Sequence, residues 1–233
     1  MSLAPAREQA PAVESRRHPL VGNRLALAGA VLYLCEFLGL VLSHAQHLPH
    51  VPGTVPGGVA ASYTGHAGGL GFLVGWFGIV QTGRVLFVVG VAAALSASGR
   101  RNPLVWFAAV AMAVGVALEI ASEALAAGAG ELAGSGQTAG AIALDRGAAY
   151  LAAGILAPSG VAILLTAWAM LRSGLFNRAL AVIGLLAGAS VVAAGLASEP
   201  ANAGLQDSLT TGVIVSWVFM LWTGVALWRG RRR

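Results

Sequence analysis

The sequence predicts an all-α membrane protein built as a bundle of six transmembrane helices. Of its 233 residues, 57% are hydrophobic and only 10% are charged, and the mean hydropathy is +0.78. Average proteins carry about a quarter charged residues, so this chain lacks the polar side chains needed to cover a globule, and its apolar surface must face lipid. Six apolar stretches are long enough to cross a bilayer core, which takes about 20 helical residues. The composition therefore argues against a water-soluble enzyme.

The six spans make up one membrane domain, residues 23–228, between two tails. The N-terminal tail, residues 1–22, lacks the apolar core of a signal peptide, so we expect it to be disordered and the first span to act as an uncleaved anchor. The basic C-terminal tail is residues 229–233. The expected spans are residues 25–44, 70–97, 103–127, 147–171, 175–197 and 209–228.

The residues beside each span set its limits. Pro49 follows the first span and cannot continue its helix. The sequence SGRRN, residues 98–102, separates the second span from the third, and Asp145 precedes the fourth. A similar sequence, SGLFN at residues 173–177, separates the fourth span from the fifth. Trp228 ends the sixth span beside the terminal arginines, where a tryptophan is expected at the membrane interface.

The arginines predict the orientation of the spans, because positive residues near span ends are retained on the cytoplasmic side. Twelve of the 14 arginines flank span ends on one side of the bundle, at positions 7, 16, 17, 24, 100, 101, 172, 178, 229, 231, 232 and 233. The loops on the other side contain no arginine and hold Glu131, Asp145, Glu199 and Asp207. We therefore expect both termini in the cytoplasm and the protein in the cell membrane. Topology and attraction to anionic lipid then account for the net charge of +5, and no nucleic-acid partner is expected.

Ionisable residues inside the spans are expected to face the bundle interior and to have partners, because a charge in hydrocarbon costs at least about 2.5–3.5 kcal/mol. At 1.5 Å per residue, Glu36 lies about 16 Å along the first span, and Arg84 lies about 21 Å from either end of the second. These depths predict a buried ion pair between Glu36 and Arg84. Gln81 and Thr82, close to Arg84, are expected to supply the remaining hydrogen bonds.

The third span carries a polar face toward its outer end. Glu119, Ser122 and Glu123 share one helical face, at spacings of three and four. Asp145 and Arg146 lie at the start of the fourth span at the same level, so an outer ion pair between Glu123 and Arg146 is expected. Glu119 is left without an obvious partner, and a buried unpaired carboxylate takes a proton or recruits a cation.

Four histidines lie near the outer ends of the first two spans. His44, His47 and His50 follow one another at intervals of three, and His66 precedes the second span. Imidazoles beside carboxylates can hold zinc or copper, although this spacing is typical of no dedicated metal site, and solvated loop histidines are the other interpretation. No other cofactor is predicted. Cys35 is the single cysteine, which excludes a disulfide framework and indicates an inert buried thiol.

Rows of small residues predict close contacts between helices, because lipid removes the hydrophobic drive for helix association. The rows are Gly71, Gly75, Gly78 and Thr82 in the second span, and Gly184, Gly188 and Gly195 in the fifth. They serve either bundle packing or dimerisation. Pro158, near the middle of the fourth span, is expected to kink that helix and to free a backbone carbonyl.

A weak internal repeat relates the second and third spans to the fourth and fifth. The SGRRN and SGLFN turns lie 75 residues apart, and the helices after them both end in Ala-Ser-Glu, at residues 121–123 and 197–199. Duplication of a helical hairpin explains this pattern. The alternative is that alanine-rich membrane helices resemble one another by composition.

The stretch LRSGLFNRALAVIGLLAG, residues 171–188, resembles a turn between late helices of the bacterial membrane-protein family called domain of unknown function 4386. That family also carries an acidic residue near the end of its third span, here Glu119 or Glu123. The similarity covers about residues 23–228, and a Phe-Asn pair replaces the family's usual proline after the turn. The resemblance implies a multi-helix membrane fold and supplies no activity or catalytic residue.

Three functions are compatible with the sequence. The first is a non-catalytic helical bundle or accessory subunit, whose buried charges fix helix register and whose partner is another membrane subunit or a copy of itself. The second is a small proton- or cation-coupled transporter that uses Glu36, Arg84 and Glu119. The third is an extracytoplasmic metal-binding protein or enzyme that uses the histidines after the first span. No phosphate-binding loop, HExxH, nucleophile elbow or Cys-x-x-Cys occurs, so no enzymatic activity is assigned.

Overall fold

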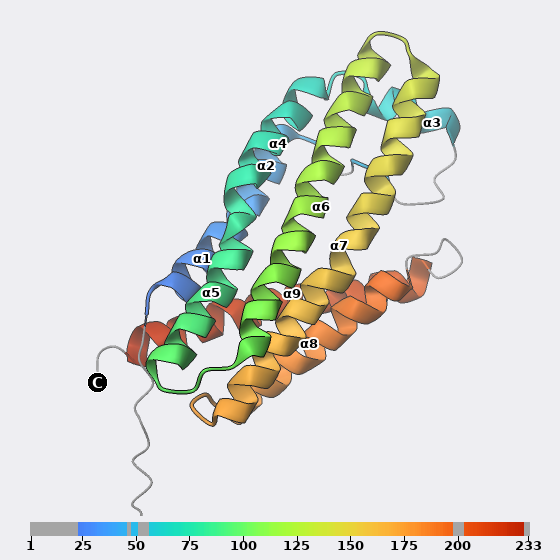
Figure 1. Ribbon diagram of the computed structural model, residues 1–233. Helices are drawn as coiled ribbons and strands as arrows, with labels where there is room; N and C mark the ends of the chain where they lie inside the picture. Colours follow the sequence, from blue (N-terminus) through green and yellow to red (C-terminus); the bar gives the residue numbers. More distant parts are fainter. Residues whose placement is uncertain (1–22, 46–47, 51–55, 198–202, 231–233) are drawn as a thin grey trace, which may run out of the picture.

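The computed structural model describes residues 23–45, 48–50, 56–197 and 203–230, and within these ranges the chain forms helices and no strand (Figure 1). The helices are α1 (Leu25–Leu34), α2 (Glu36–Ser43), α3 (Pro56–Tyr63), α4 (Ala67–Val80), α5 (Thr82–Ala97), α6 (Pro103–Gly134), α7 (Thr138–Ser173), α8 (Arg178–Leu196) and α9 (Ala203–Gly230). The helical pairs α1–α2 and α4–α5 each form one long apolar segment. With α6, α7, α8 and α9 they give six segments able to cross a membrane by length and composition. The predicted all-α six-helix membrane bundle is confirmed.

The α6–α7 hairpin is longer than the two spans expected there. At 1.5 Å per residue, the 32 residues of α6 extend about 48 Å, whereas a bilayer core is about 30 Å thick. Alanine and leucine, which favour helix, continue past the expected spans on both helices, and Gly136 turns the chain with a positive φ of 77°. The hairpin therefore rises beyond the other long helices at one end of the molecule (Figure 1). The short helix α3, which the sequence analysis did not predict, packs against its flank on α6 and α7.

Six helices close into a ring through successive contacts. In order around the ring, α1 contacts α5, α5 contacts α6, α6 contacts α7, α7 contacts α8, α8 contacts α9, and α9 returns to α1. The other half of the bundle, toward the α6–α7 turn, which we call the outer half, is built differently. There α2 packs on α4, and α4 packs on α6. Helices α6 and α7 run through both halves (Figure 1).

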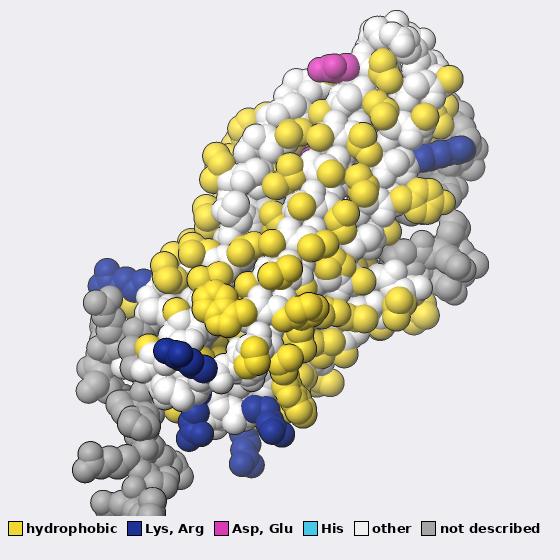
Figure 2. All heavy atoms as spheres, in the orientation of Figure 1, with side chains coloured by type: hydrophobic (Ala, Val, Ile, Leu, Met, Phe, Trp, Pro, Cys, Tyr) yellow, Lys and Arg dark blue, Asp and Glu magenta, His cyan; other side chains and the backbone are white. Residues whose placement is uncertain are grey.

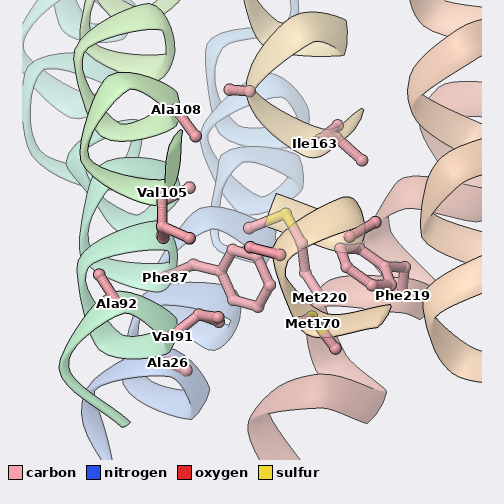
Figure 3. Close-up of a cluster of buried hydrophobic side chains, with 14 of the residues drawn as sticks. Ala26, Phe87, Val91, Ala92, Val105, Ala108, Ile163, Met170, Phe219 and Met220 are labelled. Carbon is pink, nitrogen blue, oxygen red and sulfur yellow. The ribbon is translucent and has the colours of Figure 1, made fainter. Parts of the chain in front are cut away.

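Two separate apolar clusters fill the two halves of the bundle. The ring encloses a cluster in which Phe87 and Phe219 meet edge to face, with ring centroids 5.9 Å apart, beside Met170 and Met220 (Figure 3). A second cluster joins α3 and α4 to the outer parts of α6 and α7, around Tyr63 and neighbouring leucine, phenylalanine and alanine side chains. Along α4–α5 and α6, Gln81, Arg84, Glu119 and Glu123 lie between residues of the two clusters.

Glycines allow α1 to approach α5, and α7 to approach α8, at backbone contact. A Cβ at Gly29 would lie 2.5 Å from the carbonyl oxygen of Gly83, and one at Gly188 would lie 2.7 Å from the backbone nitrogen of Leu164. The predicted packing row in the fifth span is confirmed, because Gly184 and Gly195 also meet neighbouring helices, at Cβ distances of 2.5 Å and 2.9 Å.

The predicted packing row in the second span is wrong within this chain. A Cβ at Gly71, Gly75 or Gly78 would have nothing within 4 Å, and Thr82 is exposed. The row faces outward because the opposite face of α4 carries the large apolar side chains that enter the outer cluster, including Leu70, Leu73 and Phe77. Pro158 lies within the continuous helix α7, and the expected kink there stays a prediction.

The two similar turns have the same local geometry. Gly99 and Gly174 both adopt a positive φ, of 72° and 66°. Asn102 and Asn177 then cap the following helices, since their side-chain oxygens accept from the backbone N–H groups of Leu104 and Ala179 at 3.0 and 2.9 Å. An asparagine in this position satisfies an otherwise free helix N-terminus.

Six of the eight described arginines gather at one end of the bundle. Arg24, Arg100, Arg101, Arg172, Arg178 and Arg229 lie at helix ends or turns on the side of the SGRRN and SGLFN sequences. Figure 2 shows this basic end, with a single basic side chain near the opposite end of the same face. Figure 2 shows apolar side chains spread over the surface between the ends. Large exposed apolar residues of the molecule include Trp106, Phe107, Leu186 and Trp222. This distribution matches a protein that spans a bilayer.

Candidate functional site

A polar cluster occupies the level at which two of the membrane segments are interrupted. The first segment breaks at Cys35, between α1 and α2, and the second breaks at Gln81, between α4 and α5. Each break is a tight turn: Cys35 donates to the carbonyl of Leu32, and the carbonyl of Gln81 accepts from Arg84, with N–O distances of 3.1 Å. Breaks of this kind inside a helix often mark functional positions. Here they place Glu36 and Gln81 at the centre of the bundle.

The buried ion pair of this cluster joins Arg84 to Glu119. The Arg84 Nη2 group donates to Glu119 Oε2, and both side chains are largely buried. The predicted pair between Glu36 and Arg84 is therefore wrong, as is the expectation that Glu119 lacks a partner. Counting residues placed Glu36 at the depth of Arg84 and Glu119 nearer the outer end of its span, but the sideways packing of α5 on α6 brings Glu119 to the guanidinium. The Arg84 guanidinium also lies over the ring of Tyr33, 5.0 Å from its centroid.

A single amide group connects the two carboxylates of the cluster. Gln81 Nε2 donates to Glu36 Oε2 at 2.9 Å and to Glu119 Oε1 at 2.8 Å. Gln81 thus supplies hydrogen bonds to the central charged groups, as the sequence predicts. Thr82 plays no part, because its hydroxyl donates to the carbonyl of Ile79 in its own helix. The cluster thus links α2, the α4–α5 junction, α5 and α6.

The charges of the cluster do not balance. Glu36 and Glu119 supply two carboxylates, whereas Arg84 supplies one guanidinium and is already engaged by Glu119. Among the described residues, Glu36 has no cationic side chain within ion-pair distance. Glu36 is half-buried, and a carboxylate withdrawn from water without a counter-charge is neutralised by a proton or by a bound cation. The cluster is therefore able to exchange protons or to hold a positive charge.

A cavity of about 170 Å³ adjoins the cluster on the axis of the bundle. Its polar wall consists of Tyr33, Glu36, Arg84, Glu119, Ser159 and Ser216, and its apolar wall of Met112, Ala152, Ile155, Leu156, Ile163, Val191, Val213 and Met220. The walls come from seven helices. Arg84 is 5% exposed, and its Nε has no hydrogen-bond partner among the described residues. A buried donor in a cavity wall is normally satisfied by water or by a ligand.

Asp145 organises a second polar site toward the outer end of the bundle. It accepts from the Tyr63 hydroxyl at 2.6 Å and from the backbone nitrogen of His50 at 3.0 Å, and its carboxylate lies 3.0 Å from His50 Nδ1. Burial, together with the hydrogen bond to Asp145, raises the pKa of Tyr63 above its ordinary value. These contacts attach the segment after α2, and helix α3, to α7.

The expected outer pair between Glu123 and Arg146 is wrong. Glu123 is buried, and its Oε2 has no hydrogen-bond partner among the described residues, whereas Arg146 is exposed. The two residues were assigned to one level of the membrane, but Glu123 is enclosed by the bundle whereas Arg146 lies on its surface. Ser122, beside Glu123, donates to the carbonyl of Ala148 at 2.9 Å and so holds α6 against α7.

Three of the four candidate metal-binding histidines line one cavity. His44, His50 and His66 border a space of about 250 Å³ together with Ser62. Within the part of the chain that the structure describes, no group of three or more His, Cys, Asp or Glu residues is arranged to hold a metal ion. His47 lies outside the described residues. His50 already contacts the carboxylate of Asp145. Of the three histidines that line the cavity, one is therefore held by a side chain of α7.

Cys35 has a structural environment at the α1–α2 break. Its thiol is free and half-buried, 3.5 Å from the carbonyl oxygen of Val31. Its own carbonyl accepts from Trp76 Nε1 at 2.9 Å, in addition to the backbone nitrogens of Leu38 and Gly39, so the indole of α4 is attached to the break.

Sequence reasoning missed Tyr33 and Ser159 at the central site and Tyr63 at the outer one. Tyr33 lies one helical turn before Glu36, and that spacing of three could have revealed their shared face. Ser159 Oγ, 3.5 Å from Arg84 Nη1, directly follows the proline that was singled out. Tyr63 gave no signal, because the loop that carries it had no expected helix.

Comparison of the sequence with models of protein families, with curated proteins and with solved structures gives no match.

Proposed function

We propose that this integral membrane protein is a small proton- or cation-coupled carrier whose binding site is the central cavity. The observation that supports this function is the unbalanced polar cluster in the cavity wall, where Glu36 and Glu119 face a single guanidinium, that of Arg84. A carboxylate that must be neutralised at the centre of a membrane is the group that proton-coupled transport requires.

The organisation of the helices supports the same function. Carriers commonly build their sites at interrupted membrane helices near the middle of the bilayer. In this chain both interruptions, at Cys35 and Gln81, lie beside the cluster. A purely structural ion pair would need one carboxylate and a filled core, whereas this core retains a second carboxylate and a cavity.

We also propose an orientation and a location for the carrier. The basic end of the bundle (Figure 2) faces the cytoplasm, with both termini on that side, because arginines near span ends are retained there. The membrane is the cell membrane. Membership of the domain of unknown function 4386 family rests on the turn at residues 171–188 and brings no activity with it. A carrier with six spans is expected to work as a homo-oligomer.

Proton flux in reconstituted vesicles tests the function. Purified protein in liposomes containing a pH-sensitive dye should dissipate an imposed pH gradient when candidate solutes are supplied outside, and Glu36→Gln should abolish that flux. Glu131→Gln is the matched control, because Glu131 is an exposed carboxylate far along α6 from the cavity. Equal flux in wild type and Glu36→Gln would refute the proposal.

A second candidate function is the non-catalytic bundle or accessory subunit, and one observation favours it. The hydrogen bonds of Gln81 and Arg84 tie α2, α5 and α6 together, with Ser159 of α7 at the margin, as a device that fixes helix register would. Under this function, Glu36→Gln would change protein yield or subunit association and no flux would be measurable. Co-purification from native membrane would then identify a partner subunit or a second copy of the chain.

A further inference from the structure

We infer that the central cavity binds a small organic cation with an apolar body, and that Glu36 is its counter-charge. This inference rests on the proposed carrier function and assigns the class of its solute. It combines the charge distribution around the cavity, the nature of the cavity walls and the cavity volume.

The uncompensated negative charge of the cluster is located on Glu36. Glu119 is paired with Arg84 and also accepts from Gln81. Among the described residues, Glu36 accepts only from the neutral amide of Gln81, at 2.9 Å. A cation that enters the cavity therefore gains most by approaching Glu36, because the charge of Arg84 is already compensated by Glu119.

The groups facing Glu36 from neighbouring helices preserve this negative character. Tyr33 of α1 is a neutral phenol, and Gln81 is a neutral amide. Helix α6 contributes two further acids, Glu119 and the buried Glu123, and α5 contributes the single cation, Arg84. Ser159 of α7 and Ser216 of α9 complete the polar wall without charge. Three acids thus face one cation among the described residues, and an anionic ligand would add to this excess, whereas a monocation reduces it.

The rest of the wall favours an apolar body attached to the charge. Methionine and branched aliphatic side chains form most of the lining, including Met112, Ile155, Leu156 and Met220. A cavity of about 170 Å³ is close to the size of an apolar protein cavity of about 150 Å³ that holds benzene. The occupant is therefore a molecule of roughly six to eight non-hydrogen atoms, such as a small aromatic or branched aliphatic amine.

Binding is an exchange of charges in which one proton leaves for each cation bound. In the absence of a ligand, a proton on the Glu36 carboxyl balances the cluster. When the cation enters, that proton passes to solvent and the carboxylate accepts the ammonium group, so the net charge of the site is conserved. By linkage, affinity for the cation should rise about tenfold per pH unit while Glu36 of the empty protein is protonated.

An isosteric series of three compounds tests the inference. Benzylammonium chloride, benzyl alcohol and sodium benzoate have the same ring and carry a positive, a neutral and a negative group. We would titrate each into the full-length protein in lipid nanodiscs by calorimetry, with empty nanodiscs as the reference. Benzylammonium should bind at least about tenfold more tightly than the other two, with release of one proton detected from the buffer dependence of the heat.

Variants separate the role of Glu36 from general effects. Glu36→Gln should abolish benzylammonium binding and proton release, whereas the exposed-site control Glu131→Gln should bind as the wild type does. If Glu36→Gln does not fold, proton release by the wild-type protein still tests the exchange. Binding of benzylammonium without proton release, or unchanged binding in Glu36→Gln, would overturn the inference.

The outcomes also distinguish failure of this inference from failure of the proposed function. If benzyl alcohol or benzoate binds as tightly as benzylammonium, the cavity is a solute site but the cation class is wrong. If none of the three binds, the solute class is wrong, and flux that depends on Glu36 decides whether the carrier function survives. Loss of both binding and flux refutes both.

Discussion

Arg84 of α5 pairs with Glu119 of α6 while Glu36 of α2 reaches the same cluster only through the Gln81 amide. The two carboxylates therefore have different roles. Glu119 compensates a guanidinium and is a structural element of the core. Glu36 is free to change its proton or its partner without leaving Arg84 unpaired.

Breaking the Arg84–Glu119 pair from one side should destabilise the protein strongly. Glu119→Leu leaves a buried guanidinium without its main acceptor, and Arg84→Leu leaves the cluster with two unpaired acids. Removal of one partner of a buried ion pair costs about 3–5 kcal/mol, and we expect a large fall in thermal stability and in yield of monodisperse protein, measured by fluorescence-detected size exclusion.

The double variant Arg84→Leu/Glu119→Leu is the control for this prediction. It removes both charges together, so it should recover most of the stability that either single change loses. Additive losses in the double variant would show that the two side chains do not act as a pair.

Two glycine substitutions should have opposite outcomes. Gly188→Val places a Cβ within 2.7 Å of the α7 backbone and should cost about 1–3 kcal/mol through overpacking. Gly75→Val is the matched change on an open surface, with nothing within 4 Å of the added Cβ, and should leave the unfolding temperature unchanged. Similar losses in both would contradict the packing of α7 on α8.

A loss of oligomer confined to Gly75→Val would identify the outward row of α4 as a contact between copies.

Tyr63→Phe should loosen the outer segment. The change removes the 2.6 Å hydrogen bond to Asp145 and leaves a buried carboxylate with fewer donors, at a cost of about 1–3 kcal/mol. Hydrogen exchange of the α3 region should become faster, while that of α8 and α9 should not change. Unaltered exchange in α3 would show that Asp145 does not hold it.

The same phenol, which lies outside the membrane-spanning segments, should make stability depend on alkaline pH. Its pKa is raised in the folded protein and returns to about 10 on unfolding. Its contribution is therefore complete below pH 10 and is lost as pH rises further, because the unfolded chain gives up a proton that the folded chain retains. Unfolding temperatures between pH 9 and 11 should fall more steeply for the wild type than for Tyr63→Phe. Parallel curves would contradict this assignment.

Opposite ends of the bundle should be accessible from opposite sides of the membrane. In a protein with Cys35→Ala, a membrane-impermeant maleimide should label Ser135→Cys, in the exposed α6–α7 turn, in intact cells. Ala97→Cys, exposed at the end of α5, should react only after the membrane is opened. The reverse pattern would invert the proposed topology.

The features that depend on local sequence were predictable. Hydropathy located the six membrane segments because apolar length alone decides whether a helix can cross a bilayer. The asparagines of the SGRRN and SGLFN turns, Asn102 and Asn177, are N-caps, which act on their own helix and need no information from elsewhere in the chain. The central polar residues were also identified, since ionisable groups in spans are rare enough to stand out.

The features that depend on helix rotation were not predictable from one sequence. The glycines of α4 resemble those of α8 in spacing, yet α4 turns its row outward, and Gly29 and Gly83 make the close contact instead. The partner of Arg84 was missed for the same reason. Residue counting gives the position of a side chain along a helix, whereas the choice between Glu36 and Glu119 depends on the direction in which each helix presents its side chains.

The breaks at Cys35 and Gln81 lie next to a tight contact between α2 and α4. Trp76 of α4 donates to the carbonyl of Cys35, and a Cβ at Gly39 of α2 would collide with its indole ring. A bulky residue at Gly39 would therefore push apart the two helices whose adjoining ends carry Glu36 and Gln81, and would disturb the polar cluster without touching any of its members.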